Sequence, residues 1–122
     1  MKLKNSILKD IRESVGLGSD VTSFDTELIM HINTAISKIN QNGVGKVLTV
    51  TDDTTTWEDL MDATQIEGNK HFQLVPLFMM LSTRIIFDPP PPSTVEYYSR
   101  NVDELLWRLK TAYMTGGEIS NV

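Results

Sequence analysis

Four consecutive prolines, Pro89 to Pro92, limit how this chain can fold more than any other feature. Proline has no backbone N–H to donate and its φ is fixed, so the run ends any helix before it and favours a short, rigid, extended rod. Asp88, just before the first proline, is pushed out of the α region by the proline ring. An apolar segment precedes the run and an amphipathic segment follows it. We therefore predict a helix, a rigid elbow and a second helix between His71 and Tyr113.

The segment before the prolines, which ends at Phe87, is apolar on nearly all sides. A helix of this kind is usually buried on most of its surface. Pro76 lies inside it, so either the regular helix begins there with Pro76 in its first turn, or residues 71–75 form a short segment kinked at that point. The segment is too short, and too closely flanked by charge, for a membrane span.

The segment after the prolines has a helix start signal and one apolar stripe. Ser93 and Glu96 have the spacing of a capping box. The stripe residues recur at about 100° per residue, and they are Val95, Tyr98, Val102, Leu105, Leu106, Leu109 and Tyr113. Tyr97 and Trp107 lie off this stripe, so they either form a second contact surface or are covered by other helices of the same chain.

Residues 5–15, 25–41 and 57–64 are predicted to form three further helices, the last of them short. Each has a residue suited to cap its N-terminus. The predicted caps are Asn5 or Ser6, Asp25 within a hydrophobic staple of Phe24 and Ile29, and Thr56 followed by Asp59. Together with the two helices around the elbow they predict a mostly α fold, a small bundle of about four main helices.

Residues 43–56 interrupt the helical pattern. They are rich in Val and Thr with partial alternation, which predicts extended chain or a short strand. A single strand needs a partner and none is obvious, so an exposed arm or pairing between subunits is plausible. We predict one domain over residues 1–115, with 43–56 as its extended arm and 116–122 as a flexible tail. The candidate subunit-interface residues are Val47, Leu48, Val50, Trp57, Tyr97 and Trp107.

Charge argues against a nucleic-acid or membrane-surface binder. The net charge is −5, with 11 Lys and Arg against 16 Asp and Glu. Phosphate contacts need Lys and Arg, and an acidic surface repels DNA, which suits a channel through which DNA slides without sticking. No unbroken apolar run follows Met1 to Lys4, so no signal peptide is predicted and synthesis in the cytoplasm is expected.

Candidate chemistry is weak throughout. With no cysteine, thiolate chemistry and Cys-based zinc sites are excluded. His31 and His71 lack the i,i+4 spacing of a helical metal pair, and the Asp52-Asp53 turn lacks the pattern of a calcium loop. We expect the remaining acidic residues of the helices to lie on solvated faces: Asp10, Glu13, Glu58, Asp59 and Asp62. We therefore expect no catalytic residue, no cofactor, no metal and no enzymatic activity.

The two motifs around the elbow resemble the head–tail connector (head-completion, or adaptor) proteins of tailed bacteriophages. In those families a helix ends in a similar L-L-F-D-P-P and the last helix carries a similar E-L-x-W-R/K-L. The matching residues here are Ile85, Ile86, Phe87, Asp88, Pro89 and Pro90, then Glu104, Leu105, Trp107 and Leu109 within E-L-L-W-R-L. The close match covers roughly the last 45 residues, and the N-terminal half agrees only in its order of elements.

This resemblance implies a structural virion protein in the neck, made in the host cytoplasm. Its copies would form a twelve-fold ring under the portal protein, extend the DNA channel without sequence-specific binding, and join the capsid to the next neck or tail-completion protein. A ring needs a heterologous interface with two different surfaces per subunit. The alternative is a small helical regulatory or nucleic-acid-binding module. Against it, Lys38 is the one basic residue among the central residues of the second helix.

Overall fold

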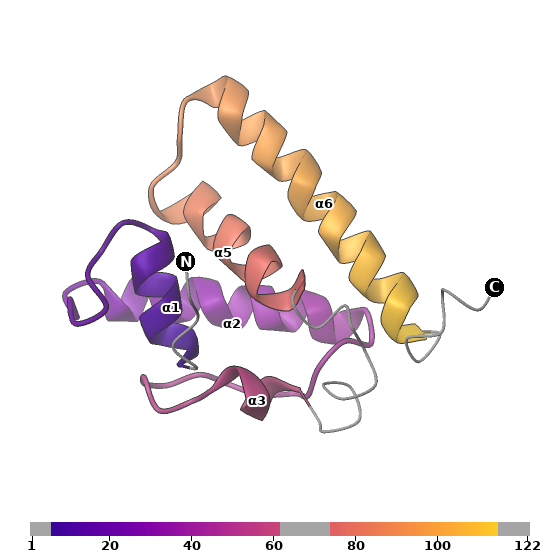
Figure 1. The fold of residues 1–122 in the computed structure, drawn as a ribbon, viewed down its shortest axis with the longest axis horizontal. Coiled ribbons are helices and arrows are strands. Elements are labelled where there is room, and N and C mark those ends of the chain that lie inside the picture. The colour runs from indigo at the N-terminus through magenta and orange to yellow at the C-terminus, as the bar shows by residue number, and fades with distance from the viewer. Residues whose placement is uncertain (1–5, 62–73, 115–122) are drawn as a thin grey trace.

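The computed structural model describes residues 6–61 and 74–114, with α6 side chains described as far as Thr111. This part of the chain is mostly helical, which confirms the predicted fold class (Figure 1). Its helices are α1 (Ile7–Ser14), α2 (Asp25–Gln41), α3 (Trp57–Leu60), α5 (Leu74–Phe87) and α6 (Pro92–Met114). The two described ranges contain no strand, only an isolated antiparallel bridge between Ser6 and Thr56.

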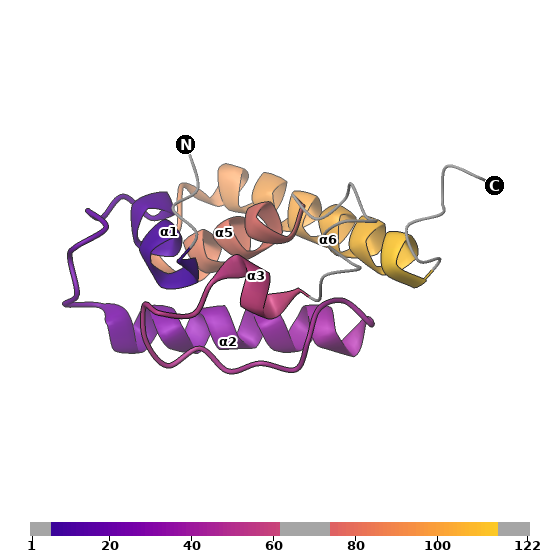
Figure 2. The ribbon, with the colours of Figure 1, turned by 60° about the horizontal axis from the view of Figure 1, so that its bottom comes forward.

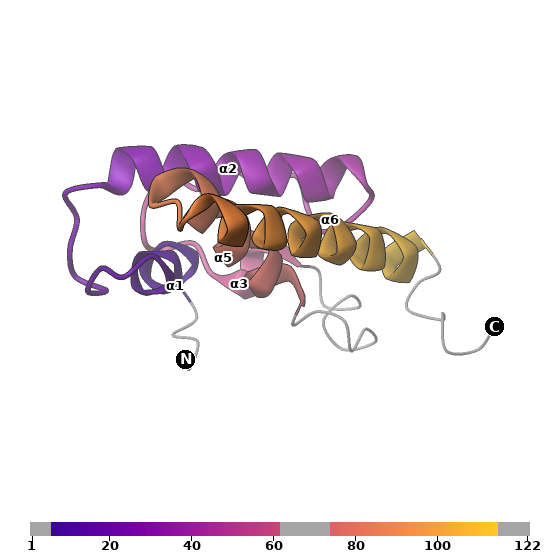
Figure 3. The ribbon, with the colours of Figure 1, turned by 90° about the horizontal axis from the view of Figure 1, so that it is seen from above.

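The helices form two layers, with α2 in one and α1, α5 and α6 in the other (Figures 2 and 3). Helix α5 contacts α1, α2 and α6, which fits its nearly all-round apolar sequence. Val75, Phe78 and Met79 on α5 are fully buried in the single hydrophobic core. Met80 packs against this core while partly exposed.

Helix α1 is fixed at both ends. The Ser6 hydroxyl caps the N-terminus by accepting from the Lys9 N–H at 3.2 Å, and it donates to the carbonyl oxygen of Asp53 at 2.8 Å. Of the two predicted caps, Asn5 lies outside the described residues. At the other end Gly16 has φ +90°, a left-handed conformation that glycine adopts without penalty, and the chain turns there.

Helix α2 has the predicted bounds, but its predicted cap is wrong. Phe24 occupies the N-cap position with no side-chain hydrogen bond, and Asp25 is already the first helical residue. The Asp25 carboxylate instead accepts hydrogen bonds from Arg12 of α1. An ion pair with a distant residue therefore replaces the local cap. The Phe24 ring packs edge-on against Phe87, with ring centroids 5.4 Å apart.

Residues 43–56, the predicted extended segment, contain no strand and run alongside α2 (Figure 2). Two asparagines of α2 bind this segment. The Asn33 amide accepts from the Val50 N–H at 2.8 Å and donates to its carbonyl at 3.0 Å, and the Asn40 amide donates to the Val44 and Lys46 carbonyls. The two amide side chains therefore make hydrogen bonds to this backbone that a neighbouring strand would otherwise make. Val44 and Val50 are buried, whereas Val47 between them is 93% exposed.

Helix α3 is shorter than predicted. The Thr56–Asp59 capping box is present, since the Thr56 hydroxyl accepts from the Asp59 N–H and the Asp59 carboxylate accepts from the Thr56 N–H. The helix ends at Leu60, whose carbonyl accepts from the Lys46 N–H at 2.7 Å. The predicted continuation to residue 64 lies outside the described residues from residue 62 on.

The elbow between α5 and α6 contains three of the four prolines. Pro76 lies in the first turn of α5, which agrees with the first of the two alternatives. Helix α6 begins at Pro92, so the predicted Ser93 capping box is wrong. Proline is well suited to the first helical position because its φ is already helical and no N–H is needed there. The Pro91 carbonyl accepts from the Thr94 and Val95 N–H groups at 2.9 and 3.0 Å.

Candidate assembly surfaces

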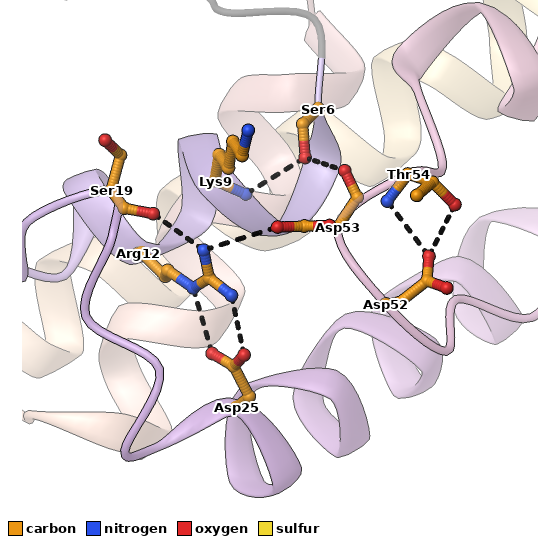
Figure 4. Close-up of polar contacts among 8 residues, drawn as sticks. All are labelled: Ser6, Lys9, Arg12, Ser19, Asp25, Asp52, Asp53 and Thr54. Atoms are coloured by element: carbon orange, nitrogen blue, oxygen red, sulfur yellow. Dashed lines mark hydrogen bonds and ion pairs between the residues drawn. The ribbon is translucent and has the colours of Figure 1, made fainter.

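A buried arginine joins three separate parts of the chain (Figure 4). The Arg12 guanidinium donates to both carboxylate oxygens of Asp25, at 2.9 and 2.6 Å, and to the Ser19 carbonyl at 2.6 Å. The Asp53 carboxylate lies 4.0 Å away. Only 3% of the Arg12 side chain is exposed. This cluster links α1 to the following loop, to α2 and to the extended segment. It therefore fixes the positions of these parts of the chain relative to one another.

Two pKa shifts accompany this region. The hydrogen bonds to Asp25 raise the pKa of Arg12 above its ordinary value, with further attraction from Asp25, Asp53 and Asp20 outweighing the opposing effect of burial. Hydrogen bonds from the Thr54 hydroxyl and then its N–H lower the pKa of the exposed Asp52. Arg12 is therefore a permanent cation, and Asp52 closes a local turn, as expected for that loop.

Asp10 corrects one sequence prediction, because it is fully buried and not on a solvated face. Its carboxylate accepts a 2.7 Å hydrogen bond from the Trp57 indole N–H. Trp57 is only 2% exposed, so it is a core residue of this chain and not part of a free surface. Sequence reasoning missed Asp10 and Arg12 because their partners lie far along the chain.

The residues of the two connector-like motifs divide between core and surface. Leu105 and Leu109 are buried on α6, and Phe87 is partly buried against the core. The exposed or partly exposed members are Ile85, Ile86, Asp88, Pro89, Pro90, Glu104 and Trp107. Within the second motif Glu104 pairs with Arg108, four residues further along the helix, at 2.8 Å. The two motifs therefore contribute residues both to the hydrophobic core and to the exposed surface.

The candidate interface residues also divide. Val50 and Trp57 are in the core, and Leu48 packs against it while partly exposed. Trp107 is 66% exposed and Tyr97 is 60% exposed. No other part of the described chain covers these two rings, and their role as a second contact surface stays a prediction. Both lie on α6, so the outer side of this helix carries two exposed aromatic rings among charged residues, in addition to the buried stripe.

Two clefts flank α6. The first, of about 190 Å³, lies between α2, α5 and α6 and has Ala35, Ile85, Ile86 and Val102 in its walls, with His31 and Ser82 among its polar groups. We call it the three-helix cleft. The second, of about 250 Å³, lies between α5 and α6 and includes Leu77, Leu81 and Leu105. Leu77 and Ile86 remain 45% and 54% exposed, so α5 is less enclosed than its sequence suggested.

His31 is partly buried beside Glu27, with its Nε2 atom 3.6 Å from the Glu27 Oε1 atom. The other histidine, His71, lies outside the described residues. Within residues 6–61 and 74–114, no group of three or more His, Asp or Glu side chains is placed to hold a metal ion. No helix in the same ranges is long and apolar enough to cross a membrane.

These features define a small, mostly helical protein whose described surface is marked by exposed apolar and aromatic side chains. Comparison with protein-family models gives a match to the phage connector protein family over residues 7–116. The chain therefore belongs to the phage connector family, a structural family whose members contact other virion proteins. A search of curated proteins gave no match. A search of solved structures gave no match either.

Proposed function

We propose that this chain is a subunit of the ring that joins the phage head to the tail. In this role it sits beneath the portal vertex, extends the DNA channel and presents a surface to the next neck or tail-completion protein. The observation that carries the proposal is the family match over residues 7–116. The role is structural and needs no catalysis. It belongs to the assembled virion, at the neck, after synthesis in the host cytoplasm.

The described surface supports an assembly role. Trp107, Tyr97, Met30 and Ile86 are each more than half exposed. Exposed aromatic and large aliphatic side chains are typical anchors of protein interfaces, where a few of them dominate the binding energy. A twelve-fold ring requires two unlike surfaces on each subunit. The outer face of α6 and the clefts beside it are unlike surfaces of this kind.

The charge of the chain supports a passive relation to DNA. A net charge of −5 disfavours the phosphate contacts that hold DNA to a protein. Lys38 is the one Lys or Arg in α2, so this helix lacks the basic face of a recognition helix. This argues against a nucleic-acid-binding module and for a channel wall past which DNA moves.

The proposal is tested by removing the gene from the phage and examining the particles. Without the chain, DNA-filled heads that lack tails are expected, and adding the purified protein to them together with free tails restores infectivity. Quantitative mass spectrometry of complete particles is expected to give one copy per portal subunit. Tailed, infective particles assembled without the chain would rule the connector role out.

A further inference from the structure

The asparagine–glycine pair at the end of α2 has a chemistry that the connector role does not use. Asn42-Gly43 is the one Asn-Gly pair in the sequence. The backbone nitrogen of the residue after an asparagine can attack the side-chain carbonyl carbon Cγ and close a cyclic succinimide. Glycine in that position hinders the attack least, because it has no side chain. By its sequence, Asn42 is therefore the asparagine of this chain most prone to deamidate.

The reaction needs only water. The Gly43 nitrogen forms a bond to Asn42 Cγ and gives up its proton, while the bond between Cγ and Nδ2 breaks and ammonia leaves. Water then opens the ring at one of its two carbonyl carbons. Attack at Cγ gives aspartate, and attack at the main-chain carbonyl carbon gives isoaspartate, in which the chain runs through the side chain. Both products carry a carboxylate in place of the amide.

The folded turn holds the two reacting atoms apart. Asn42 is the C-cap of α2, with φ −100° and ψ 14°. A ψ near zero places the Gly43 nitrogen beside the Asn42 backbone nitrogen and away from Cβ, so ring closure requires rotation about the bond between Cα and the carbonyl carbon. The Gly43 N–H also donates to the Asn40 carbonyl at 3.0 Å. The Asn42 amide donates to the Lys38 carbonyl at 2.8 Å, which keeps Cγ over the last turn of the helix.

Both sides of this turn are anchored in the core. Ile39 and Val44 are fully buried, and the Val44 N–H donates to the Ile39 carbonyl at 2.9 Å. The Asn40 side-chain amide donates to the Val44 carbonyl at 2.8 Å and to the Lys46 carbonyl at 2.9 Å. Rotation of the Asn42 backbone toward the reactive geometry therefore has to displace chain that Asn40 holds in place.

The turn itself lies at the surface. Gly43 is exposed and Asn42 is partly exposed. A side chain at position 43 would project into open space, so water and hydroxide reach this part of the backbone. A surface turn of this kind opens at a lower free-energy cost than the whole domain. Deamidation therefore proceeds in the fraction of molecules whose turn is open.

We propose that Asn42 is a spontaneous deamidation site, that the folded turn keeps the reaction slow, and that the Asn40 side chain is the main restraint on the turn. The products weaken the same turn. A carboxylate cannot donate to the Lys38 carbonyl, and isoaspartate lengthens the main chain between the buried Ile39 and Val44. Deamidation thus loosens the start of segment 43–56 irreversibly. The proposal stands independently of the connector role.

Incubation of the purified full chain at mildly alkaline pH, followed by peptide mass spectrometry, tests the proposal. Conversion of Asn42 to aspartate and isoaspartate is measured in buffer and in enough guanidinium chloride to unfold the chain. The unfolded chain is expected to convert at least about tenfold faster, because the turn is then open in every molecule. Asn42 is also expected to be the first asparagine converted in the unfolded chain. This comparison uses wild type alone, so it does not depend on the folding of any variant.

Two variants test the restraint. Asn40→Ala removes both side-chain bonds to segment 43–56 but keeps the main-chain carbonyl that binds Gly43. Asn33→Ala is the matched control, because it also removes two bonds from α2 to this segment, both at Val50. In buffer, Asn40→Ala is expected to convert at least about fivefold faster than wild type, the effect of losing one net hydrogen bond. Asn33→Ala is expected to convert at the wild-type rate.

Three results would overturn the proposal: equal conversion at Asn42 in the folded and unfolded chain, another asparagine converted first in the unfolded chain, or an Asn40→Ala variant that converts no faster than Asn33→Ala. Thermal unfolding of both variants confirms that they are folded in buffer. None of these results bears on whether the chain is present in the particle.

Discussion

Replacing Asp25 with alanine removes the carboxylate that holds a buried guanidinium. Arg12 is 3% exposed and Asp25 is 25% exposed, so the variant leaves a charge that water cannot easily reach. Breaking a buried ion pair from one side costs about 3–5 kcal/mol. The lower end applies here, about 3 kcal/mol, because the Ser19 carbonyl still accepts at 2.6 Å and Asp53 lies 4.0 Å away.

Removing both charges is expected to cost less than removing one. Arg12→Met fills most of the same volume with apolar atoms, and an apolar replacement of a buried pair is often neutral. The double variant Arg12→Met/Asp25→Ala is therefore expected to be about 1–2 kcal/mol more stable than Asp25→Ala alone. This order of stabilities is the signature of an uncompensated buried cation.

Urea unfolding followed by circular dichroism measures both differences. For a domain of this size a loss of 3 kcal/mol corresponds to a fall in Tm of about 12 °C. Glu104→Ala is the control, because its 2.8 Å pair with Arg108 is about half exposed on both sides and should contribute no more than about 0.5 kcal/mol. A double variant less stable than Asp25→Ala, or an Asp25→Ala variant close to wild type, would refute the reasoning.

Three further predictions concern single side chains. Trp57→Phe leaves the buried Asp10 carboxylate without its 2.7 Å indole donor and is expected to cost about 1.5–3 kcal/mol in urea unfolding; an unchanged midpoint would contradict the role of that bond. Phe78→Ala empties a fully buried site and is expected to cost about 3–5 kcal/mol by the same assay, whereas a loss under about 1 kcal/mol would mean that this ring is not in a packed core. Thr54→Ala removes the hydroxyl that lowers the pKa of Asp52 below its ordinary 3.8, so carbon NMR of the carboxyl group should show that pKa rising. The contact stabilises the fold above pH 3.8 and its contribution is lost as pH falls through the lowered pKa; an identical titration in the variant would count against it.

The sequence predicted those elements whose signals are local. The bounds of α2, the end of α5 at Phe87 and the Thr56–Asp59 capping box follow from helical spacing and from prolines, and the structure agrees. Two caps were wrong for identifiable reasons. At α6 the proline at position 92 starts the helix before Ser93, and at α2 a residue of another helix binds the predicted cap.

What the sequence could not predict depends on contacts between distant residues. The Asp10–Trp57 bond spans 47 residues, and nothing near Asp10 in the sequence shows that α3 will cover it. The Arg12 cluster likewise draws on α2 and the extended segment. The three-helix cleft comes from the packing of α2 against α5 and α6, with orphaned atoms at His31 and Ser82. Helical spacing did place Trp107 off the buried stripe, and it is exposed.

The central claim is that this chain is a connector subunit at the head–tail junction. A cryo-electron microscopy reconstruction of the neck, in the phage particle that carries this gene, tests it most directly. The account predicts a ring of this chain stacked on the portal around the DNA channel. A well-resolved neck without the chain, together with its absence from the particle by mass spectrometry, would contradict it.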